Sequence, residues 1–123
     1  MSCLVDSNII IDYLRQATAA VSFIHALPGK PSVAVVSVAE LFAGARSRQE
    51  ERRIDRLLDR SNVLPVTRDI ARIAGQYVKH YQRSYGLDDF DALIAATAEH
   101  HALSLATLNI KHFPMIKGLK LAY

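Results

Sequence analysis

The sequence predicts an α/β fold with a parallel sheet at its centre. Short apolar segments of the kind that form buried strands alternate with longer segments of helical periodicity along the whole chain. Strands that alternate with helices pair in parallel through right-handed crossovers. Half of the 123 residues are hydrophobic and 22% are charged, which is a globular composition, and this length suits a single domain that spans residues 1–123.

The first strand is expected at residues 3–5, and a carboxylate, Asp6, follows it directly. Ser7 can cap the next helix, because its hydroxyl can accept a hydrogen bond from an early backbone N–H. The apolar face of this helix consists of Ile10, Ile11 and Leu14. A second helix is expected at about residues 18–26, and the proline- and glycine-containing residues 28–31 form a loop.

The second strand is expected at residues 33–36, which are apolar at nearly every position, as in a strand covered on both faces. A helix follows this strand directly and is weakened by Gly44 near its end. A charged helix is predicted at residues 47–60. Its core face consists of Ile54, Leu57 and Leu58. Residues 62–66 then form a short third strand.

The second half of the chain begins with a long helix that Thr67 caps, that runs to about Ser84 and that Gly86 ends. The apolar face of this helix consists of Ile70, Ile73, Ala74, Tyr77, Val78 and Tyr81. An alanine-rich helix with acids at its start leads to a fourth strand at residues 104–107. Residues 119–122 suit a last edge strand.

Acidic residues recur where strands end and helices begin. They are Asp6 after the first strand, Glu40 after the second, and Asp91 with nearby Asp89 at the start of the alanine-rich helix. The polar residues Thr107 and Asn109 follow the fourth strand. In a parallel sheet these positions converge on one edge, where ligands bind. Crowded carboxylates repel one another unless a cation lies between them, and oxygen ligands suit Mg²⁺ or Mn²⁺.

Each acid also has a structural alternative. Ser37-x-x-Glu40 is the pattern of a capping box, so Glu40 could serve only to cap a helix. Asp89 and Asp91 could serve only to favour the helix dipole. Asp6 is harder to explain structurally, because a carboxylate that ends a buried strand needs a partner. The combination of acids favours a metal site more strongly than any one of them does.

The formal net charge of +3 is a mild indication of a polyanionic partner. Many of the basic residues fall in one window: Arg46, Arg48, Arg52, Arg53, Arg56 and Arg60. Because four acids are interspersed there, the simplest interpretation is a solvated helix face. The alternative is that some of these arginines engage nucleic-acid phosphates.

The five histidines do not predict a transition-metal site, because their spacing forms no cluster. A single cysteine, Cys3, cannot form an internal disulfide, which suits a reducing compartment. No basic segment followed by a long apolar run opens the chain, and no apolar run is long enough to span a bilayer. We therefore expect a cytoplasmic protein without membrane contact.

Four segments of the chain resemble those of PIN-domain ribonucleases, and specifically of VapC toxins from type II toxin–antitoxin pairs. The segments are Val5-Asp6-Ser7-Asn8 with residues 9–14, residues 37–41 with Gly44, residues 91–98, and Thr107-Leu108-Asn109 with residues 111–113. They occur in the family's order and extend over nearly the whole chain. The resemblance implies a three-layer α/β/α sandwich with a central parallel sheet.

The resemblance also implies an endoribonuclease that depends on Mg²⁺ or Mn²⁺, in which metal-activated water attacks a phosphodiester. The three family acids correspond to Asp6, Glu40 and Asp91, which would be both catalytic residues and metal ligands. The fourth position, often an aspartate in the family, is Asn109 here, and Asp89 is a candidate for the missing charge. Further supporting residues would be Ser7, Asn8 and Thr107.

For partners, the resemblance implies a homodimer and a VapB-type antitoxin whose C-terminal segment blocks the site. The resemblance also implies that operator DNA is contacted only through the antitoxin. It further allows higher assemblies of toxin and antitoxin. The RNA substrate would be a structured RNA, either tRNA or rRNA. Candidate residues for binding the RNA phosphates are Arg46, Arg53 and Lys111.

Three other functions remain open at this point. A catalytically weak PIN-like module that binds RNA or protein is favoured by the neutral Asn109. A haloacid-dehalogenase-like phosphatase would need a second acid two residues after Asp6, where this chain has Asn8. A response-regulator receiver would need paired early acids and a late lysine at a strand end.

Overall fold

The computed structural model describes residues 3–123, except for the side chains of residues 83–85. Its sheet consists of β1 (Leu4–Val5), β2 (Ser32–Ala34), β3 (Asn62–Leu64) and β4 (Leu105–Ala106). Its helices are α1 (Ser7–Leu14), α2 (Thr18–His25), α3 (Val35–Ala43), α4 (Arg48–Asp59), α5 (Arg68–Tyr85), α6 (Asp89–His100) and the short 3-10 helix η1 (Ile110–His112).

The sheet is parallel throughout, and its strands lie in the order β3-β2-β1-β4. Each of the first three strands is followed by helices that carry the chain back to the start of the next strand, as the sequence predicted. All four carboxyl ends therefore lie at one edge of the sheet. A single residue separates β1 from α1, and α3 begins directly after β2. The first residues of both helices are therefore also held at that edge.

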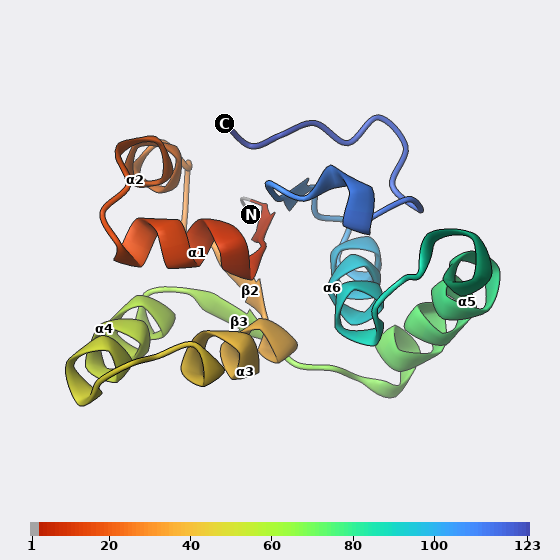
Figure 1. Ribbon diagram of the computed structural model, residues 1–123, viewed down its shortest axis with the longest axis horizontal. Helices are drawn as coiled ribbons and strands as arrows, with labels where there is room; N and C mark the ends of the chain where they lie inside the picture. The colour runs from red at the N-terminus through yellow and green to blue at the C-terminus, as the bar shows by residue number, and fades with distance from the viewer. Residues whose placement is uncertain (1–2) are drawn as a thin grey trace.

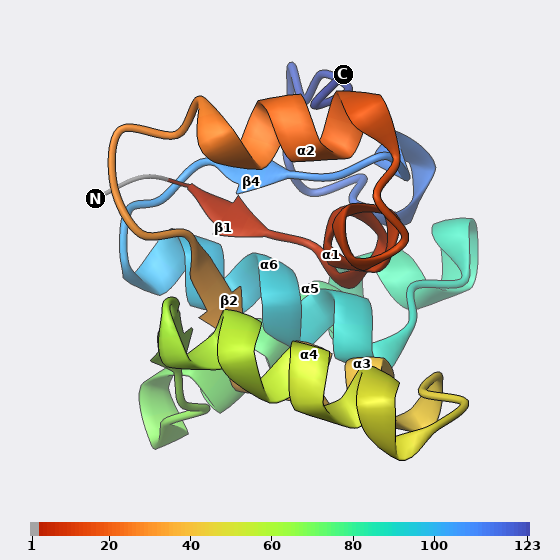
Figure 2. The ribbon, with the colours of Figure 1, turned by 90° about the vertical axis from the view of Figure 1, so that its left-hand side faces the viewer.

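Helices cover both faces of the sheet, which confirms the three-layer α/β/α sandwich (Figure 1). Neighbouring strand residues point to opposite faces. Leu4, Ala34 and Leu105 pack with Ile94 and Ala98 of α6. On the other face the core consists of Val5, Val33, Ala106, Ile9, Ile10, Leu41 and Ile54. In Figure 2, accordingly, α4 lies in front of the strands and α6 lies behind them.

The ends of several helices lie where the sequence predicted them. Thr67 caps α5, since its hydroxyl oxygen accepts from the Ile70 N–H at 3.2 Å. Gly86 ends α5 with a φ of 61°, a left-handed conformation that glycine adopts without strain. Ser47 is the N-cap of α4, the charged helix, and it accepts from the Glu50 N–H at 3.1 Å.

Four strand predictions need correction. The second strand ends at Ala34, because Val35 and Val36 already form the first turn of α3. A short apolar run does not by itself distinguish a strand from a buried helical turn. The third strand ends at Leu64, ahead of Pro65, which has no N–H for the ladder.

The fourth strand is limited to Leu105–Ala106, and residues 119–122 do not form the expected edge strand. The Ala122 N–H nevertheless donates to the Thr107 carbonyl at 3.2 Å, so the C-terminal segment lies beside β4 without a continuous ladder. Along the described part of the chain, no helix has both the length and the apolar character needed to cross a membrane.

Candidate active site

Asp6 is the N-cap of α1 and is 5% exposed. Its Oδ1 accepts from the Ser7 N–H at 2.8 Å, and its Oδ2 accepts from the Thr107 hydroxyl at 2.7 Å. The prediction that Ser7 caps this helix was therefore wrong by one residue, because Ser7 is already the first helical residue. A buried carboxylate with two hydrogen bonds is held in one orientation and still has lone pairs free.

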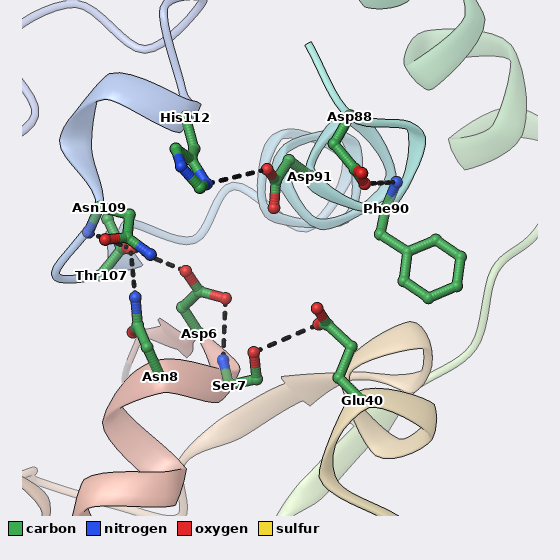
Figure 3. A network of polar contacts seen from close by, with 10 residues as sticks. All are labelled: Asp6, Ser7, Asn8, Glu40, Asp88, Phe90, Asp91, Thr107, Asn109 and His112. Carbon is green, nitrogen blue, oxygen red and sulfur yellow. Dashed lines mark hydrogen bonds and ion pairs between the residues drawn. The ribbon is translucent and has the colours of Figure 1, made fainter. Parts of the chain in front are cut away.

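Thr107 connects the ends of β4 and β1. Its side chain is fully buried, and while its hydroxyl donates to Asp6, its oxygen accepts from the Asn109 N–H at 3.0 Å and from the Asn8 amide at 3.5 Å. Figure 3 shows these contacts converging on the hydroxyl. The supporting residues Asn8 and Thr107 thus fix the position of Asp6 from two elements.

Glu40 lies in the second turn of α3 and points toward Asp6. Its Oε1 accepts from the Ser7 hydroxyl at 3.2 Å. The capping-box alternative is wrong, because Ala34 occupies the N-cap position and Ser37 lies inside the helix, where its hydroxyl has no described hydrogen-bond partner. With no cap to form, the Glu40 carboxylate is directed by Ser7 and faces the cavity described below.

The start of α6 supplies the remaining acids. Asp88 is the N-cap, and its Oδ1 accepts from the Phe90 N–H at 2.7 Å. Asp89 and Asp91 lie in the first turn. Asp91 turns toward η1, where His112 Nδ1 lies 3.2 Å from Asp91 Oδ2. Capping therefore accounts for Asp88, while Asp91 makes a tertiary contact that the helix itself does not require.

These side chains surround one open cavity of about 570 Å³. Its lining consists of Asp6, Ser7, Asn8, Glu40, Asp88, Asp89, Phe90, Asp91, Asn109 and His112. Neither Lys nor Arg is among these residues. The cavity is thus a pocket of concentrated negative charge at the carboxyl edge of the sheet, with His112 as its basic side chain.

Burial disfavours the charged forms of these acids, and neighbouring charges add to the effect at Glu40 and Asp91. Burial raises the pKa of Asp6, although hydrogen bonds from Thr107 and Ser7 act against this. Burial also raises the pKa of Glu40, and the charges of Asp6 and Asp91 add to the effect. The pKa of Asp91 rises to about 6, mainly through burial, while His112 opposes the rise and the Asp6 charge adds to it. A cation in the cavity would reverse these costs.

The donor set fits a hard divalent cation, because carboxylate oxygens predominate and the cavity has room for bound water. Among the side chains that the structure describes, no three from His, Cys, Asp or Glu converge closely enough to hold one ion between them. A cation here would have few direct protein ligands, with water between it and the remaining carboxylates. Mg²⁺ is commonly bound in this way.

The fold brings most of the predicted site residues together. Asp6, Glu40, Asp91, Asn109, Ser7, Asn8 and Asp89 line the cavity, and Thr107 lies directly behind Asp6. Asn109 makes its described contact through its backbone N–H, and its side chain is exposed.

The basic candidates lie elsewhere. The Arg53 guanidinium donates to the Leu14 carbonyl at the end of α1. The Arg46 backbone N–H donates to Glu50 Oε2 at 2.7 Å, and its side chain is exposed. Lys111 belongs to η1 and is adjacent to His112, but it does not line the cavity.

Three residues of the cavity had no predicted role: Asp88, Phe90 and His112. Asp88 could have been found as a helix cap, since an aspartate directly before a helix is a common N-cap. Phe90, which is 43% exposed, is marked only by its position among the acids. His112 is separated from Asp91 by a strand and a loop, so no sequence spacing reveals their contact.

Comparison with known proteins agrees with this architecture. The PIN domain family model matches residues 3–117. Ribonuclease VapC10 of Mycobacterium tuberculosis is 45% identical over 95% of this chain and 90% of its own length. Ribonuclease VapC19 of the same organism is 36% identical over 98% of both chains.

Solved structures are similar in the same way. A chain of a toxin–antitoxin complex from Klebsiella pneumoniae superposes with a TM-score of 0.85 at 31% identity, covering 99% of this chain and 98% of its own. A chain of VapBC-1 from nontypeable Haemophilus influenzae gives a TM-score of 0.75 at 28% identity, with coverages of 98% and 96%. The fold and its acid-lined edge define the class, and the chain belongs to the PIN-domain family and, within it, to the VapC ribonucleases.

Proposed function

We propose that this protein is a Mg²⁺- or Mn²⁺-dependent endoribonuclease that acts as the toxin of a toxin–antitoxin pair. The observation that carries the proposal is the convergence of Asp6, Glu40 and Asp91 on one open cavity, where each has a raised pKa. Like charges gathered in this way are costly to the fold and useful to a metal-dependent reaction. The VapC ribonucleases to which the chain is similar support RNA as the substrate.

In this proposal Asp6, Glu40 and Asp91 hold the cation, either directly or through water. When bound, a divalent cation lowers the pKa of water and offsets charge that develops on a phosphodiester. Asp6 is oriented by Thr107 and by the Ser7 N–H, so it does not reorganise when the substrate arrives. The Ser7 hydroxyl keeps Glu40 turned toward the same space.

Other cavity residues would position the RNA. Phe90 presents an exposed ring at the cavity, and an aromatic face of this kind can stack against an unpaired base. Asn109 can orient water through its amide but adds no charge. Asp89 lies in the lining and can compensate in part for the missing fourth acid. We infer that the substrate is a structured RNA, tRNA or rRNA, cut where its bases are unstacked.

The partners follow from the same relationship. The Klebsiella neighbour was solved as a toxin–antitoxin complex, which supports a VapB-type antitoxin for this chain. We infer a cytoplasmic homodimer in which residues 1–123 act as one domain, with higher assemblies formed through the antitoxin. In this proposal operator DNA is contacted through the antitoxin only.

The test compares RNA cleavage by wild type, Asp6→Asn and Asp91→Asn with Mg²⁺ or Mn²⁺ present. Each substitution keeps the side-chain size and removes one charge that holds the cation. We expect activity to fall by about 10²- to 10³-fold, the usual loss on removing one preorganised electrostatic group. Asp55→Asn is the matched control, because Asp55 is an exposed carboxylate of α4 outside the cavity, and it should leave cleavage unchanged.

Folded Asp6→Asn that cleaves RNA as fast as wild type would contradict the proposal. If wild type and Asp6→Asn both bind RNA and neither cleaves it, the result would instead favour the second candidate, a PIN-like module that binds without cleaving. The neutral Asn109 at the fourth acid position is the observation that favours this alternative.

A further inference from the structure

His112 is the basic side chain in the lining of an acidic cavity, and it contacts one of the acids there, Asp91. It is carried by η1, which follows β4 and crosses the same edge of the sheet as Asp6. Its imidazole nitrogen Nδ1 lies 3.2 Å from Asp91 Oδ2. His112 therefore contacts one of the three carboxylates to which the proposed function assigns the cation, and it lines the same cavity as the other two.

The distance between His112 and Asp91 matches that between two ligands of one ion. Adjacent ligands of an octahedral ion bound at about 2.1 Å lie about 3.0 Å apart. The observed separation from His112 Nδ1 to Asp91 Oδ2 is 3.2 Å. This separation is compatible with one ion that contacts both atoms, and the cavity beside them is open.

We propose that His112 contributes an imidazole nitrogen to the cation site, so that the site favours Mn²⁺ over Mg²⁺. This inference rests on the proposed function, because it assigns a further ligand to the same cavity. The reason is the chemistry of the donors. Mg²⁺ strongly prefers oxygen ligands, whereas imidazole suits the divalent transition metals.

The inference also explains how the site differs from one with four acids. Asn109 leaves the fourth position without charge, and its side chain makes no described contact with the carboxylates. His112 supplies a stronger ligand than an amide at the same edge while adding no negative charge as a neutral imidazole. The three carboxylates therefore provide the charge, and His112 provides selectivity between metals.

The competing explanation is that His112 only forms an ion pair with Asp91. Both explanations predict the contact at 3.2 Å, so stability measurements do not separate them. Direct coordination does, because a nitrogen bound to Mn²⁺ couples magnetically to the unpaired electrons of the metal. Electron spin-echo envelope modulation of the Mn²⁺-loaded protein detects this coupling independently of activity.

The experiment uses the full chain loaded with Mn²⁺ alone. We expect nitrogen modulation in wild type, its loss in His112→Gln and its persistence in His80→Gln, a control in which the exposed histidine of α5 lies outside the cavity. Titrations with Mn²⁺ and Mg²⁺ should show that His112→Asp narrows the ratio of the two dissociation constants by about tenfold, the lower range for a change near a metal site.

The outcomes separate this inference from the proposed function. Mn²⁺ that binds and supports RNA cleavage without nitrogen modulation would overturn the role of His112 and leave an ion pair only, with the proposed function intact. Nitrogen modulation that persists in His112→Gln would also overturn the role of His112 as a metal ligand. Failure of Mn²⁺ to bind wild type, together with absent cleavage, would overturn both proposals.

Discussion

Two regions of the molecule gather side chains of like charge, and they differ in burial. At the carboxyl edge of the sheet, Asp6, Glu40 and Asp91 surround one cavity, where burial raises the pKa of each and the charge of Asp6 adds to the rise at Glu40 and Asp91. Along α4, Arg56 and Arg60 line a shallow groove of about 330 Å³ beside α1, and both are exposed. Water screens the arginines, whereas the fold removes much of that screening from the acids.

Holding charges together costs more free energy at the buried acids than at the exposed arginines. Exposed arginines at helical spacing repel weakly and need no special support. Asp6 is 5% exposed, and the Thr107 hydroxyl and the Ser7 N–H hold it among other acids. A fold that uses buried hydrogen bonds to keep carboxylates together has a use for their charge, and this argues for function at the acid cavity ahead of the α4 groove.

Among changes that leave the three carboxylates in place, the largest expected effect comes from removing the hydrogen bond that supports Asp6. Thr107→Val keeps the side-chain shape but deletes the hydroxyl that donates to Asp6 Oδ2 at 2.7 Å. We expect cation affinity and RNA cleavage to fall by about 10- to 100-fold, the usual effect of losing a residue that orients a metal ligand. Isothermal titration with Mn²⁺ and a cleavage assay would measure the two losses.

Two controls sharpen this test. Thr107→Ser retains the hydroxyl and should retain most of the affinity. Thr97→Val removes the hydroxyl of another fully buried threonine, which donates to the Leu93 carbonyl within α6 at 2.7 Å, and it should leave cleavage unchanged. Equal losses in Thr107→Val and Thr97→Val would indicate a general packing defect and contradict the special role of Thr107.

A smaller effect is expected on stability and its dependence on pH. Because the folded pKa of Asp91 is raised to about 6, its stabilising contribution is complete below its unfolded pKa and is lost as the pH rises through about 6. Without divalent cations, Asp91→Asn should therefore be more stable than wild type at pH 8 by about 1 kcal/mol, allowing for solvent screening. Urea unfolding at pH 8 and pH 5 would measure the difference.

This advantage should shrink as the pH falls from 8 to 5, because the wild-type carboxyl then takes up its proton. Asp55→Asn, at an exposed position of α4, should show neither effect. An Asp91→Asn protein less stable than wild type at pH 8 would mean that the acids do not strain the cation-free fold.

Much of the fold was predictable because it depends on local periodicity. Alternating apolar and helical segments were enough for the parallel sheet, and Thr67 and Gly86 marked the limits of α5 through ordinary cap chemistry. The errors fell where local patterns are degenerate. Val35 and Val36 suit a strand as well as a helix, and the local sequence does not show that α3 begins directly after Ala34.

For the site, the convergence of Asp6, Glu40 and Asp91 was predictable, because parallel strands place their carboxyl ends together. The N-cap position could not be assigned between Asp6 and Ser7, since both residue types cap helices equally well. The contact between His112 and Asp91 depends on how η1 crosses the edge after β4, and sequence spacing carries no information about that path.

The smallest expected effect concerns RNA binding, and it tests which region meets the substrate. Lys111 belongs to η1, beside the acid cavity, whereas Arg46 lies in the exposed segment between α3 and α4. If RNA enters at the acid cavity, Lys111→Gln should weaken binding a few-fold and lower the slope of log affinity against log salt by about 0.7, the value for one phosphate contact on a single strand. Arg46→Gln should change neither quantity. Filter binding of RNA by catalytically inactive Asp6→Asn protein over a range of salt would measure both, and the reverse result would move the RNA surface toward α4.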